Sequence, residues 1–402
     1  MNNFLTKQQA EQLVSQYGSP LYVYDKATLV SKIQNLKNMF EVPSVIKYAI
    51  KANYNPTLAK IVLQNGLEID AVSQNECELA LRCGAKPSQI LFTESNANDE
   101  QIDWAVAKSI KINCGSISRL QKLGQKYPEL EIFCRITTKT GDGHHSKTST
   151  YGLNSKFGIF WEDVPQMKQI IDKYNLNLIG LHQHIGSGIY DIASFEKVVD
   201  PFLEFAKNFE TVKYLDFGGG FATRYKEGEN ELDIGKLGAF MDQKILQFEL
   251  ETGRKIIPII EPGRYVVNDC GILLTTCTTL KQNSIRNFAG VDTGFNHLIR
   301  YAMYESYHHI VNYLNLNGQE IIYNIAGNMC ESSDFLARDR KMPEIREGDI
   351  LGILSCGAYG MCMASNYNLQ PLPAEVLVLQ SGITKLIRKR QSFEDIFNCS
   401  EV

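Results

Sequence analysis

A (β/α)8 barrel joined to a second, β-rich domain is the fold class that this sequence predicts. Between Val45 and Ile260, short apolar runs rich in strand-forming residues alternate with amphipathic helical patterns. After Arg264 the helical patterns largely stop, and strands joined by turns follow. The chain has 402 residues, which is more than one hydrophobic core normally serves. These observations together predict two domains of different type.

Eight apolar runs account for the predicted barrel strands: VIKYAI, LEIDAV, ILFT, IKINC, EIFCRI, LIGLHQ, VKYLDF and IIPII. Helical patterns separate most of them, for example at residues 55–66, 75–85, 98–109 and 116–127. Several of these patterns begin with Asn or Ser and end near glycine, as capped helices do. Eight such βα units match the rhythm of a (β/α)8 barrel.

Strands are predicted in the second domain at residues 266–280, 287–295, 320–328, 349–355 and 374–382. We place the barrel at residues 30–265 and a sandwich-like or barrel-like β domain at residues 1–29 and 266–402. The basic stretch 383–392 lies near acidic residues, which favours a solvated surface strand or tail.

Composition excludes several classes of partner and site. The net charge of −4 gives no electrostatic reason to expect nucleic acid or an anionic membrane. The polar amino-terminal stretch does not resemble a signal peptide, and glycines cut the apolar segment 350–364 below membrane-spanning length. Ten scattered cysteines without a CxxC pair predict free thiols, a cytoplasmic location and no metal site.

The chemically active residues of a (β/α)8 enzyme lie at the carboxyl ends of its strands. Lys51 follows the first run, and such a lysine is either a rim residue with its charge in water or an amine nucleophile. The other residues at predicted strand ends are Asp70, Ser73, Glu94, Arg135, His182, His184, Gly218 to Gly220, Glu261 and Arg264.

Three of these strand ends suggest an anion site and a bound ring. The backbone N–H groups of Gly218 to Gly220 can wrap a phosphate, although a tight turn explains three glycines equally well. Ser187 could add a hydroxyl, and His184 a flat ring, unless it is simply a packed strand residue. A local Glu261–Arg264 salt bridge would explain EPGR by itself. Combined with Lys51, however, the set matches what pyridoxal 5′-phosphate (PLP) requires.

The stretch Gly141–Gly158 is polar, glycine-punctuated and long, so it is either a lid over the barrel mouth or a surface loop. Its His144 and His145 have no carboxylate or third histidine at metal-ligand spacing. We therefore expect both histidines to face solvent.

Across nearly its whole length the chain resembles the barrel-type (fold type III) PLP-dependent decarboxylases, and specifically the diaminopimelate decarboxylase family. The motifs that carry the resemblance are YAIKAN, HQHIGSG, FGGGF, EPGR, LIRYAMYESYHH, CESSDFLARDR and GAYGMCMASNYN. The departures from the family pattern are Gln74 and Asn75 in place of a glycine pair, and Asn328 and Met329 in place of a common Pro and Ile.

The resemblance implies a role for each matching residue. Lys51 would hold PLP as a Schiff base, and Cys330 would protonate the substrate carbon. The implied cofactor-binding residues are Lys51, Asp70, His184, Ser187, Gly219, Gly220, Glu261, Gly263, Arg264 and Tyr359. The implied substrate-binding residues are Arg264, Arg300, Tyr304, Glu331 and Tyr359. Among them Arg300 and Tyr304 would bind the distal carboxylate of the substrate, and Glu331 its distal ammonium.

The function that the resemblance implies is decarboxylation of meso-2,6-diaminopimelate to L-lysine and CO2, the last step of lysine biosynthesis, in a homodimer with shared active sites. One alternative is a decarboxylase of ornithine, arginine or D-lysine, which would make poor use of Arg300 and Tyr304. An amino-acid racemase is less consistent, because such enzymes pair the pyridine nitrogen with arginine rather than with a residue like Glu261. A catalytically dead regulator would not be expected to keep Lys51 and Cys330.

Overall fold

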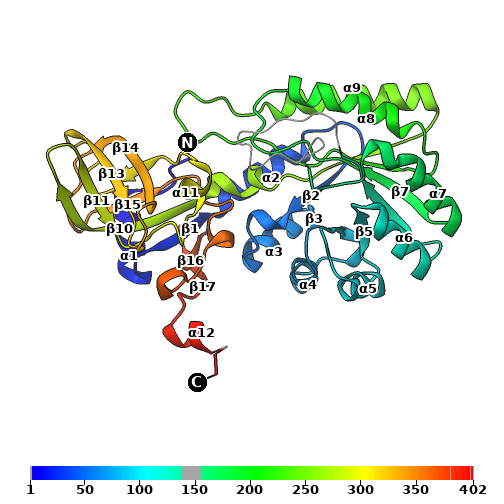
Figure 1. Cartoon of the computed structure of the whole chain (residues 1–402). Coiled ribbons are helices and arrows are strands. Elements are labelled where there is room, and N and C mark those ends of the chain that lie inside the picture. Colours follow the sequence, from blue (N-terminus) through cyan, green and yellow to red (C-terminus); the bar gives the residue numbers. More distant parts are fainter. Residues whose placement is uncertain (1, 138–154, 381, 399, 402) are drawn as a thin grey trace. The chain divides into compact units, whose positions relative to one another are not determined.

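The chain forms two compact units in the computed structural model, which describes residues 2–137, 155–380, 382–398 and 400–401. The barrel unit comprises Lys32–Thr223 and Asn230–Val266, and the β unit comprises Met1–Ser31, Arg224–Glu229 and Val267–Val402. Both units can be followed in Figure 1. The domain boundaries predicted at residues 29/30 and 265/266 remain a prediction.

Parallel strands close the barrel unit on itself, which confirms the predicted fold class. In order, the strands are β2 (Val45–Ala49), β3 (Glu68–Ala71), β4 (Ile90–Thr93), β5 (Lys111–Cys114), β6 (Glu131–Arg135), β7 (Asn177–His182), β8 (Tyr214–Asp216) and β9 (Ile257–Ile260). The barrel closes where Val45 and Ile46 of β2 pair with Ile259 and Ile260 of β9. All of the predicted apolar runs therefore contain a barrel strand.

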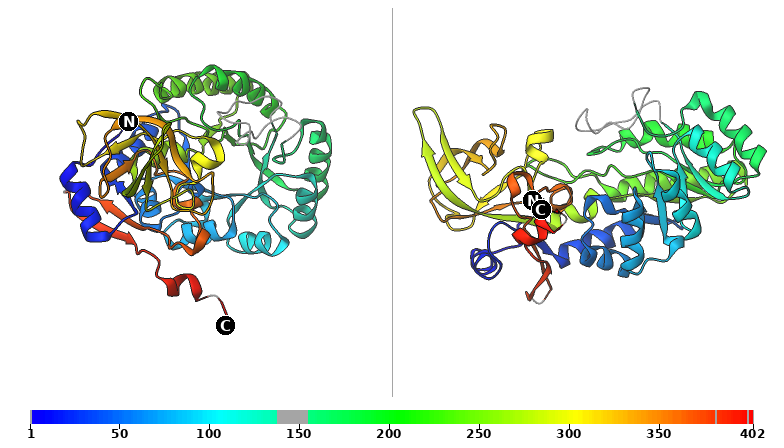
Figure 2. Two further views of the ribbon diagram at one scale, coloured as in Figure 1. Left: turned by 60° about the vertical axis from the view of Figure 1, so that its left-hand side comes forward. Right: turned by 60° about the horizontal axis from the view of Figure 1, so that its bottom comes forward.

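Helices surround these strands, as Figures 1 and 2 show. They are α2 (Lys26–Lys37), α3 (Pro56–Gln64), α4 (Gln74–Arg82), α5 (Asp99–Ala107), α6 (Ile117–Lys126), α7 (Val164–Tyr174), α8 (Ala193–Ala206) and α9 (Ile234–Thr252). The side chains of Asn55, Ser73, Asn98 and Ser116 each accept a hydrogen bond from a backbone N–H in the first turn of the helix that follows. These caps fix where each helix begins. Because all barrel strands pair in parallel, their carboxyl ends meet at one rim.

The interior of the barrel contains an apolar cluster of Leu91, Phe133, Ile179 and Ile259 from four different strands. Gly180 on β7 leaves room for this packing, because a Cβ atom there would collide with the Phe133 ring. Burying an aromatic side chain of this kind stabilises a fold by about 1.5–3 kcal/mol. This packed layer gives the strand ends above it a rigid base.

A mixed sheet forms the β unit and confirms the predicted β-rich second domain. Its main path runs β14 (Phe335–Pro343), β13 (Glu320–Ala326), β11 (Asn287–Val291), β10 (Gly271–Gln282), β1 (Leu21–Asp25), β16 (Ala374–Val378) and β17 (Thr384–Arg388), while β12 (Ile310–Asn312) and β15 (Ile350–Ile353) branch from it. Leu21, Val23, Ile272 and Val376 belong to the apolar core of this sheet. The amino-terminal strand β1 thus packs with strands from the far end of the chain.

The structure corrects one predicted strand. Residues 266–270 are not extended, because α10 (Arg264–Val267) and a short 3-10 turn, η5 (Asn268–Cys270), precede β10. Asn268 donates a side-chain hydrogen bond to Asp269 and Cys270 donates from its thiol to the Val267 carbonyl, at 3.3 and 3.1 Å. Such local bonds from short polar side chains compete with strand pairing.

The helices described in the β unit include α1 (Lys7–Tyr17), which has 11 residues, and the five-residue helices α11 (Arg300–Tyr304) and α12 (Phe393–Phe397). The basic stretch 383–392 contributes β17, so the part nearest the sheet is a strand. No helix among the described residues is long and apolar enough to cross a membrane.

Candidate active site at the carboxyl ends of the barrel strands

Lys51 lies in a 3-10 turn, η1 (Ile50–Ala52), directly after β2. Its Nζ donates a hydrogen bond of 2.9 Å to Oδ2 of Asp70. Asp70 lies in β3, and its side chain is fully buried. The lysine side chain is 41% exposed. Burial raises the pKa of Asp70 and so does the charge of Glu261, whereas Lys51 lowers it. The lysine is therefore directed at a buried carboxyl group rather than extended into water as a rim residue would be.

Glu261 follows β9 and is almost completely buried beside His182, the last residue of β7. The His182 Nε2 and Glu261 Oε2 atoms are 3.1 Å apart. Burial opposes ionisation of Glu261, but His182, Lys51 and His184 together outweigh it and lower its pKa. Its second oxygen, Oε1, is buried with no hydrogen-bond partner within the described chain. Glu261 thus presents one unsatisfied anionic acceptor.

Three consecutive glycines follow β8 and approach two other strand ends closely. Gly218 and Gly220 have φ values of +69° and +100°, a region that favours glycine. A Cβ atom on Gly220 would lie 2.7 Å from the Gly186 carbonyl oxygen, and one on Gly219 would collide with the Glu261 carbonyl. Close backbone approach therefore requires glycine at these positions.

His184 and Ser187 lie in the loop after β7. The backbone N–H of Gly219 donates to His184 Nδ1 at 3.1 Å, so this ring nitrogen acts as an acceptor. Burial, together with Arg135 and Lys51, lowers the pKa of His184 to about 3, so the ring is neutral at physiological pH. Arg264 Nη2 is 3.5 Å from Ser187 Oγ. The structure thus brings the predicted ring, hydroxyl and guanidinium to the glycine loop.

Gly263 completes the predicted barrel-side residues. A Cβ atom at this position would lie 3.1–3.2 Å from the Cβ atoms of Ala52 and Ala49 beside Lys51. Any larger residue would therefore push the β9 end away from the lysine turn.

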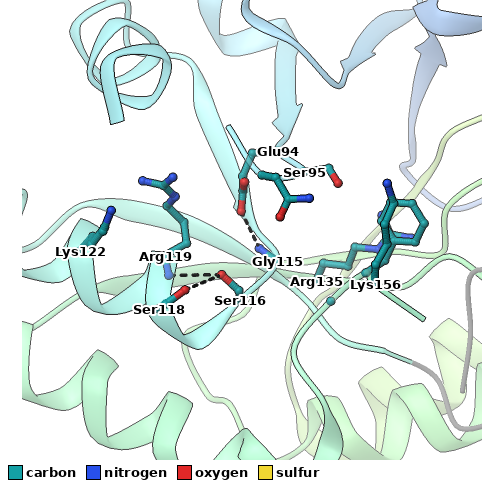
Figure 3. A pocket seen from close by; sticks show the side chains of 12 residues that line it. Glu94, Ser95, Gly115, Ser116, Ser118, Arg119, Lys122, Arg135 and Lys156 are labelled. Atoms are coloured by element: carbon teal, nitrogen blue, oxygen red, sulfur yellow. Dashed lines mark hydrogen bonds between the residues drawn. The ribbon is translucent and has the colours of Figure 1, made fainter. Parts of the chain in front are cut away.

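A pocket opens over the carboxyl ends of β4, β5 and β6, and it is drawn in Figure 3. Glu94 Oε1 accepts a hydrogen bond of 3.3 Å from the Gly115 N–H, and Ser116 Oγ accepts one of 3.2 Å from the Arg119 N–H. Arg135, at the end of β6, also borders it, and burial lowers the pKa of this guanidinium. Lys51, His184 and Glu261 do not line this pocket.

Within the β unit, Arg300 begins α11 and is only 2% exposed. Its Nη1 donates to Tyr225 Oη at 2.7 Å and lies 3.2 Å from His308 Nε2, while Nη2 donates to Ser306 Oγ at 3.3 Å. His308 is in turn 2.9 Å from the Leu354 carbonyl through Nδ1. These neutral partners fix the direction of the guanidinium. Tyr304, at the end of the same helix, is half-buried.

The other predicted residues of the β unit lie on loops. Cys330 and Glu331 are exposed in the connection between β13 and β14. The Cys330 N–H donates to Asn368 Oδ1 at 2.9 Å, and Tyr367 Oη donates to Glu331 Oε1 at 2.6 Å. Tyr359 is half-buried and has a φ of +56°. A non-glycine residue in this region marks local strain, which is common at functional sites.

Three residues that contact or lie beside the predicted site residues were not singled out from the sequence. Asp216 ends β8 beside Glu261 and His182, and Tyr225 and His308 hold Arg300. A carboxylate at the end of a barrel strand was a usable signal for Asp216. Most of Gly141–Gly158, including His144 and His145, lies outside the described residues, so the lid and solvent predictions stay untested.

The barrel-side residues fit PLP on two independent observations. The orphaned Oε1 of Glu261 is an acceptor suited to a protonated pyridine nitrogen. The glycines at 218–220 leave no space for side chains, so backbone groups there can surround a phosphate. Lys51 supplies an amine at the same end of the barrel.

Comparisons with known proteins agree with this fit. Residues 26–268 match the family described as pyridoxal-dependent decarboxylase, pyridoxal binding domain. The diaminopimelate decarboxylase of Methanothermobacter thermautotrophicus is 39% identical over 98% of this chain and 94% of its own length. That of Escherichia coli K12 is 34% identical over 98% of this chain and 96% of its own length.

Solved structures show the same relationship. A crystal structure of diaminopimelate decarboxylase has a TM-score of 0.92 and 34% identity, covering 99% of this chain and 98% of that chain. The Helicobacter pylori diaminopimelate decarboxylase complexed with L-lysine has a TM-score of 0.88 and 28% identity, covering 97% and 98%. The chain therefore belongs to the pyridoxal-dependent decarboxylases and, within them, to the diaminopimelate decarboxylase family.

Proposed function

We propose that this protein catalyses the PLP-dependent decarboxylation of meso-2,6-diaminopimelate to L-lysine and CO2, the last step of lysine biosynthesis. The observation that carries the reaction type is the buried Glu261, whose orphaned Oε1 suits a protonated ring nitrogen. Full-length identities of 34–39% to curated diaminopimelate decarboxylases support the substrate. L-lysine bound to the Helicobacter pylori relative is consistent with the product.

PLP, when bound, supplies an electron sink for the pair released as the substrate carboxylate leaves. Lys51 provides the amine that holds the cofactor, and Asp70 accepts a hydrogen bond from that amine when it is charged. Glu261 Oε1 would accept a hydrogen bond from the protonated ring nitrogen. His184, which is neutral, would offer an uncharged face for ring stacking. Ser187, Gly219, Gly220, Gly263 and Arg264 would hold the phosphate.

We propose that Arg300 and Tyr304 bind the distal carboxylate of the substrate and that Glu331 binds its distal ammonium. A planar guanidinium can bind a carboxylate through two hydrogen bonds, and the fixed direction of Arg300 reduces the entropy lost on binding. Tyr359 would contact phosphate and substrate. Cys330 would donate its thiol proton to the carbon that has lost CO2, which balances the charge left on that carbon.

We further propose a cytoplasmic homodimer in which Cys330 and Glu331 act in the partner's active site. Their exposure in the isolated chain supports this, because surface loops can meet a neighbouring subunit. A two-fold dimer would build two equivalent sites from one interface. Buried free cysteines such as Cys77, Cys114 and Cys134 suit a reducing compartment. Neither nucleic acid nor a membrane is proposed as a partner.

The proposed function is tested by measuring CO2 release from meso-diaminopimelate, D-lysine and L-ornithine side by side with purified holoenzyme. We expect release from meso-diaminopimelate, with L-lysine as product, and at most trace release from the others. Comparable turnover of L-ornithine would assign the enzyme to a different substrate. Interconversion of amino-acid stereoisomers without CO2 would indicate a racemase.

A further inference from the structure

Asp216 is a fully buried carboxyl group that the proposed mechanism does not use. It is the last residue of β8, pairs in register with His182 of β7, and is 0% exposed. Its Oδ1 accepts a hydrogen bond of 2.9 Å from the Gly218 N–H, but its Oδ2 has no partner among the described residues. One carboxyl oxygen of Asp216 therefore has a hydrogen-bond donor among the described residues, and the other has none.

Asp216 shares its surroundings with Glu261, which is assigned to the ring nitrogen in the proposed site, and with His182, which is bonded to Glu261. One nitrogen of His182 and one oxygen each of Asp216 and Glu261 lie within 4.8 Å of one another. His182 is bonded to Glu261 through Nε2, and its Nδ1 has no partner within the described chain. Two unpartnered atoms therefore belong to neighbouring groups: Oδ2 of Asp216 and Nδ1 of His182.

Two buried carboxyl groups this close cannot both ionise without a large electrostatic cost. Glu261 has an imidazole donor at 3.1 Å, whereas the described partner of Asp216 is a single backbone N–H. Burial, and then the charge of Glu261, raise the pKa of Asp216 well above its ordinary value, with the nearby Asp70 adding to the effect. The ammonium group of Lys51 and the hydrogen bond from His182 both favour charge on Glu261.

We propose that Asp216 is held as a neutral acid next to His182, and that these two positioning residues make Glu261 the single anion presented to the cofactor's ring nitrogen. This inference rests on the proposed function. Because an anionic Glu261 can only accept, His182 Nε2 carries the proton of that bond. A proton on Asp216 Oδ2 removes the second negative charge from the cluster, and neither this oxygen nor His182 Nδ1 has a hydrogen-bond partner among the described residues. The chain thereby fixes which carboxyl group is charged.

The test uses holoenzyme loaded with PLP labelled with 15N in the ring. The 15N chemical shift reports directly whether the ring nitrogen is protonated, and equilibrium dialysis gives the PLP affinity. The wild type should show a protonated nitrogen. Glu261→Gln should show an unprotonated one, which tests the proposed site itself. Glu131→Gln, at the amino end of the barrel, serves as a control that should leave both readouts at the wild-type value.

His182→Leu should shift the nitrogen toward the unprotonated form and weaken PLP binding about tenfold or more, because Glu261 loses a charge-assisted donor. His182→Gln, which restores an N–H at a similar reach, should recover most of the wild-type shift. If the leucine variant does not fold, His182→Asn replaces it, since its shorter amide cannot reach Glu261 in the same way. Asp216→Asn should keep the wild-type shift, because an amide is neutral and can still donate.

The roles of His182, Asp216 and Glu261 can each be contradicted by a separate result. A wild-type shift in the leucine or asparagine variant at His182 would show that His182 does not position Glu261. An unprotonated nitrogen in Asp216→Asn would show that Asp216 is the anion. One tightly bound divalent ion per wild-type chain, absent from Asp216→Asn by elemental analysis, would identify the three residues as a metal site and overturn the proposal. A protonated nitrogen in Glu261→Gln would instead reject the cofactor site of the proposed function.

Discussion

The candidate residues of the barrel unit and those of the β unit differ in how far the folded chain fixes them. Asp70, His182 and Glu261 are buried near strand ends, where Asp70 accepts a hydrogen bond from Lys51 and His182 is bonded to Glu261. Cys330 and Glu331 lie exposed on a loop. The barrel-side residues are therefore fixed by contacts within one chain, whereas the loop that carries Cys330 and Glu331 is exposed in the single chain.

Arg300 shows that the difference is not simply one between a barrel and a sheet. It belongs to the β unit, yet it is as buried as the barrel residues and bonded to Tyr225 and Ser306. A residue that must select a substrate group benefits from a fixed direction. A proton donor on a loop can instead depend on assembly. The distinction is thus between side chains that are buried and hydrogen-bonded, such as Arg300, and side chains exposed on a loop, such as Cys330.

Replacing Lys51 with alanine should have the largest effect on activity. Decarboxylation should fall by at least about a thousandfold because the amine that holds the cofactor is gone. Lys51 is half-exposed, so thermal unfolding of the apo-protein should change little. Lys60→Ala, on the exposed face of α3, is the matched control. Wild-type CO2 release by the Lys51 variant would remove lysine from the mechanism.

Changing Arg300 to lysine should weaken the proposed binding of the distal carboxylate of the substrate. A lysine cannot reproduce the bonds to Tyr225 and Ser306 and also bind a carboxylate through two donors. We expect KM for meso-diaminopimelate to rise about a hundredfold, equivalent to roughly 2–3 kcal/mol, with a smaller change in kcat. Arg338→Lys, exposed on β14, is the control. An unchanged KM would place the distal carboxylate elsewhere.

The buried carboxyl groups predict a pH dependence of stability. The pKa of Asp216 is raised from an ordinary value of 3.8, so the folded chain keeps a proton that the unfolded chain releases above that pH. This group should therefore lower stability by up to about 1.4 kcal/mol per pH unit as pH rises from 5.

The shift of Glu261 has the opposite sign. Its folded pKa is lowered, so its contribution is complete above its ordinary value of 4.5 and adds no slope above pH 5. Asp216→Asn should then gain stability relative to wild type between pH 5 and 7, as measured by urea unfolding of the apo-protein. A pH-independent difference would mean that Asp216 is ionised in the folded chain.

Glu331→Ala should give the smallest effect of the set. Its carboxylate is exposed and accepts a hydrogen bond from Tyr367. If it binds only the distal ammonium, KM should rise about tenfold while PLP affinity stays constant, since one charge-assisted hydrogen bond is lost. Glu320→Ala, exposed at the start of β13, provides the comparison. Loss of cofactor from the Glu331 variant would assign this residue to the PLP site.

Much of the barrel could be predicted because its information is local. Each apolar run from Val45 to Ile260 carries its own strand signal, and Asn55 or Ser116 marks the next helix. Lys51 and Glu261 were also identifiable, because a barrel exposes its strand ends on one rim. Contacts between distant residues were not. Arg300 meets Tyr225 across 75 residues of sequence, and His182 meets Glu261 across 79.

Protonation was still less accessible from the sequence. An aspartate two residues before three glycines gives no sign in the sequence that its side chain is fully buried. Only the register of β7 with β8 places Asp216 beside His182. The start of the strand predicted at residues 266–280 was wrong for a related reason, because Asn268 and Cys270 form local bonds that an apolar pattern does not reveal.

Mixing inactive Lys51→Ala and Cys330→Ala proteins tests the central claim most directly, because it requires both the reaction and the sharing of residues between subunits. After random exchange of equal amounts, half of the dimers are hybrids with one intact site, so CO2 release from meso-diaminopimelate should recover to about a quarter of wild type. Exchange is verified independently by mass-tagged subunits. No recovery despite complete exchange would contradict the account and place Lys51 and Cys330 in the same chain's site.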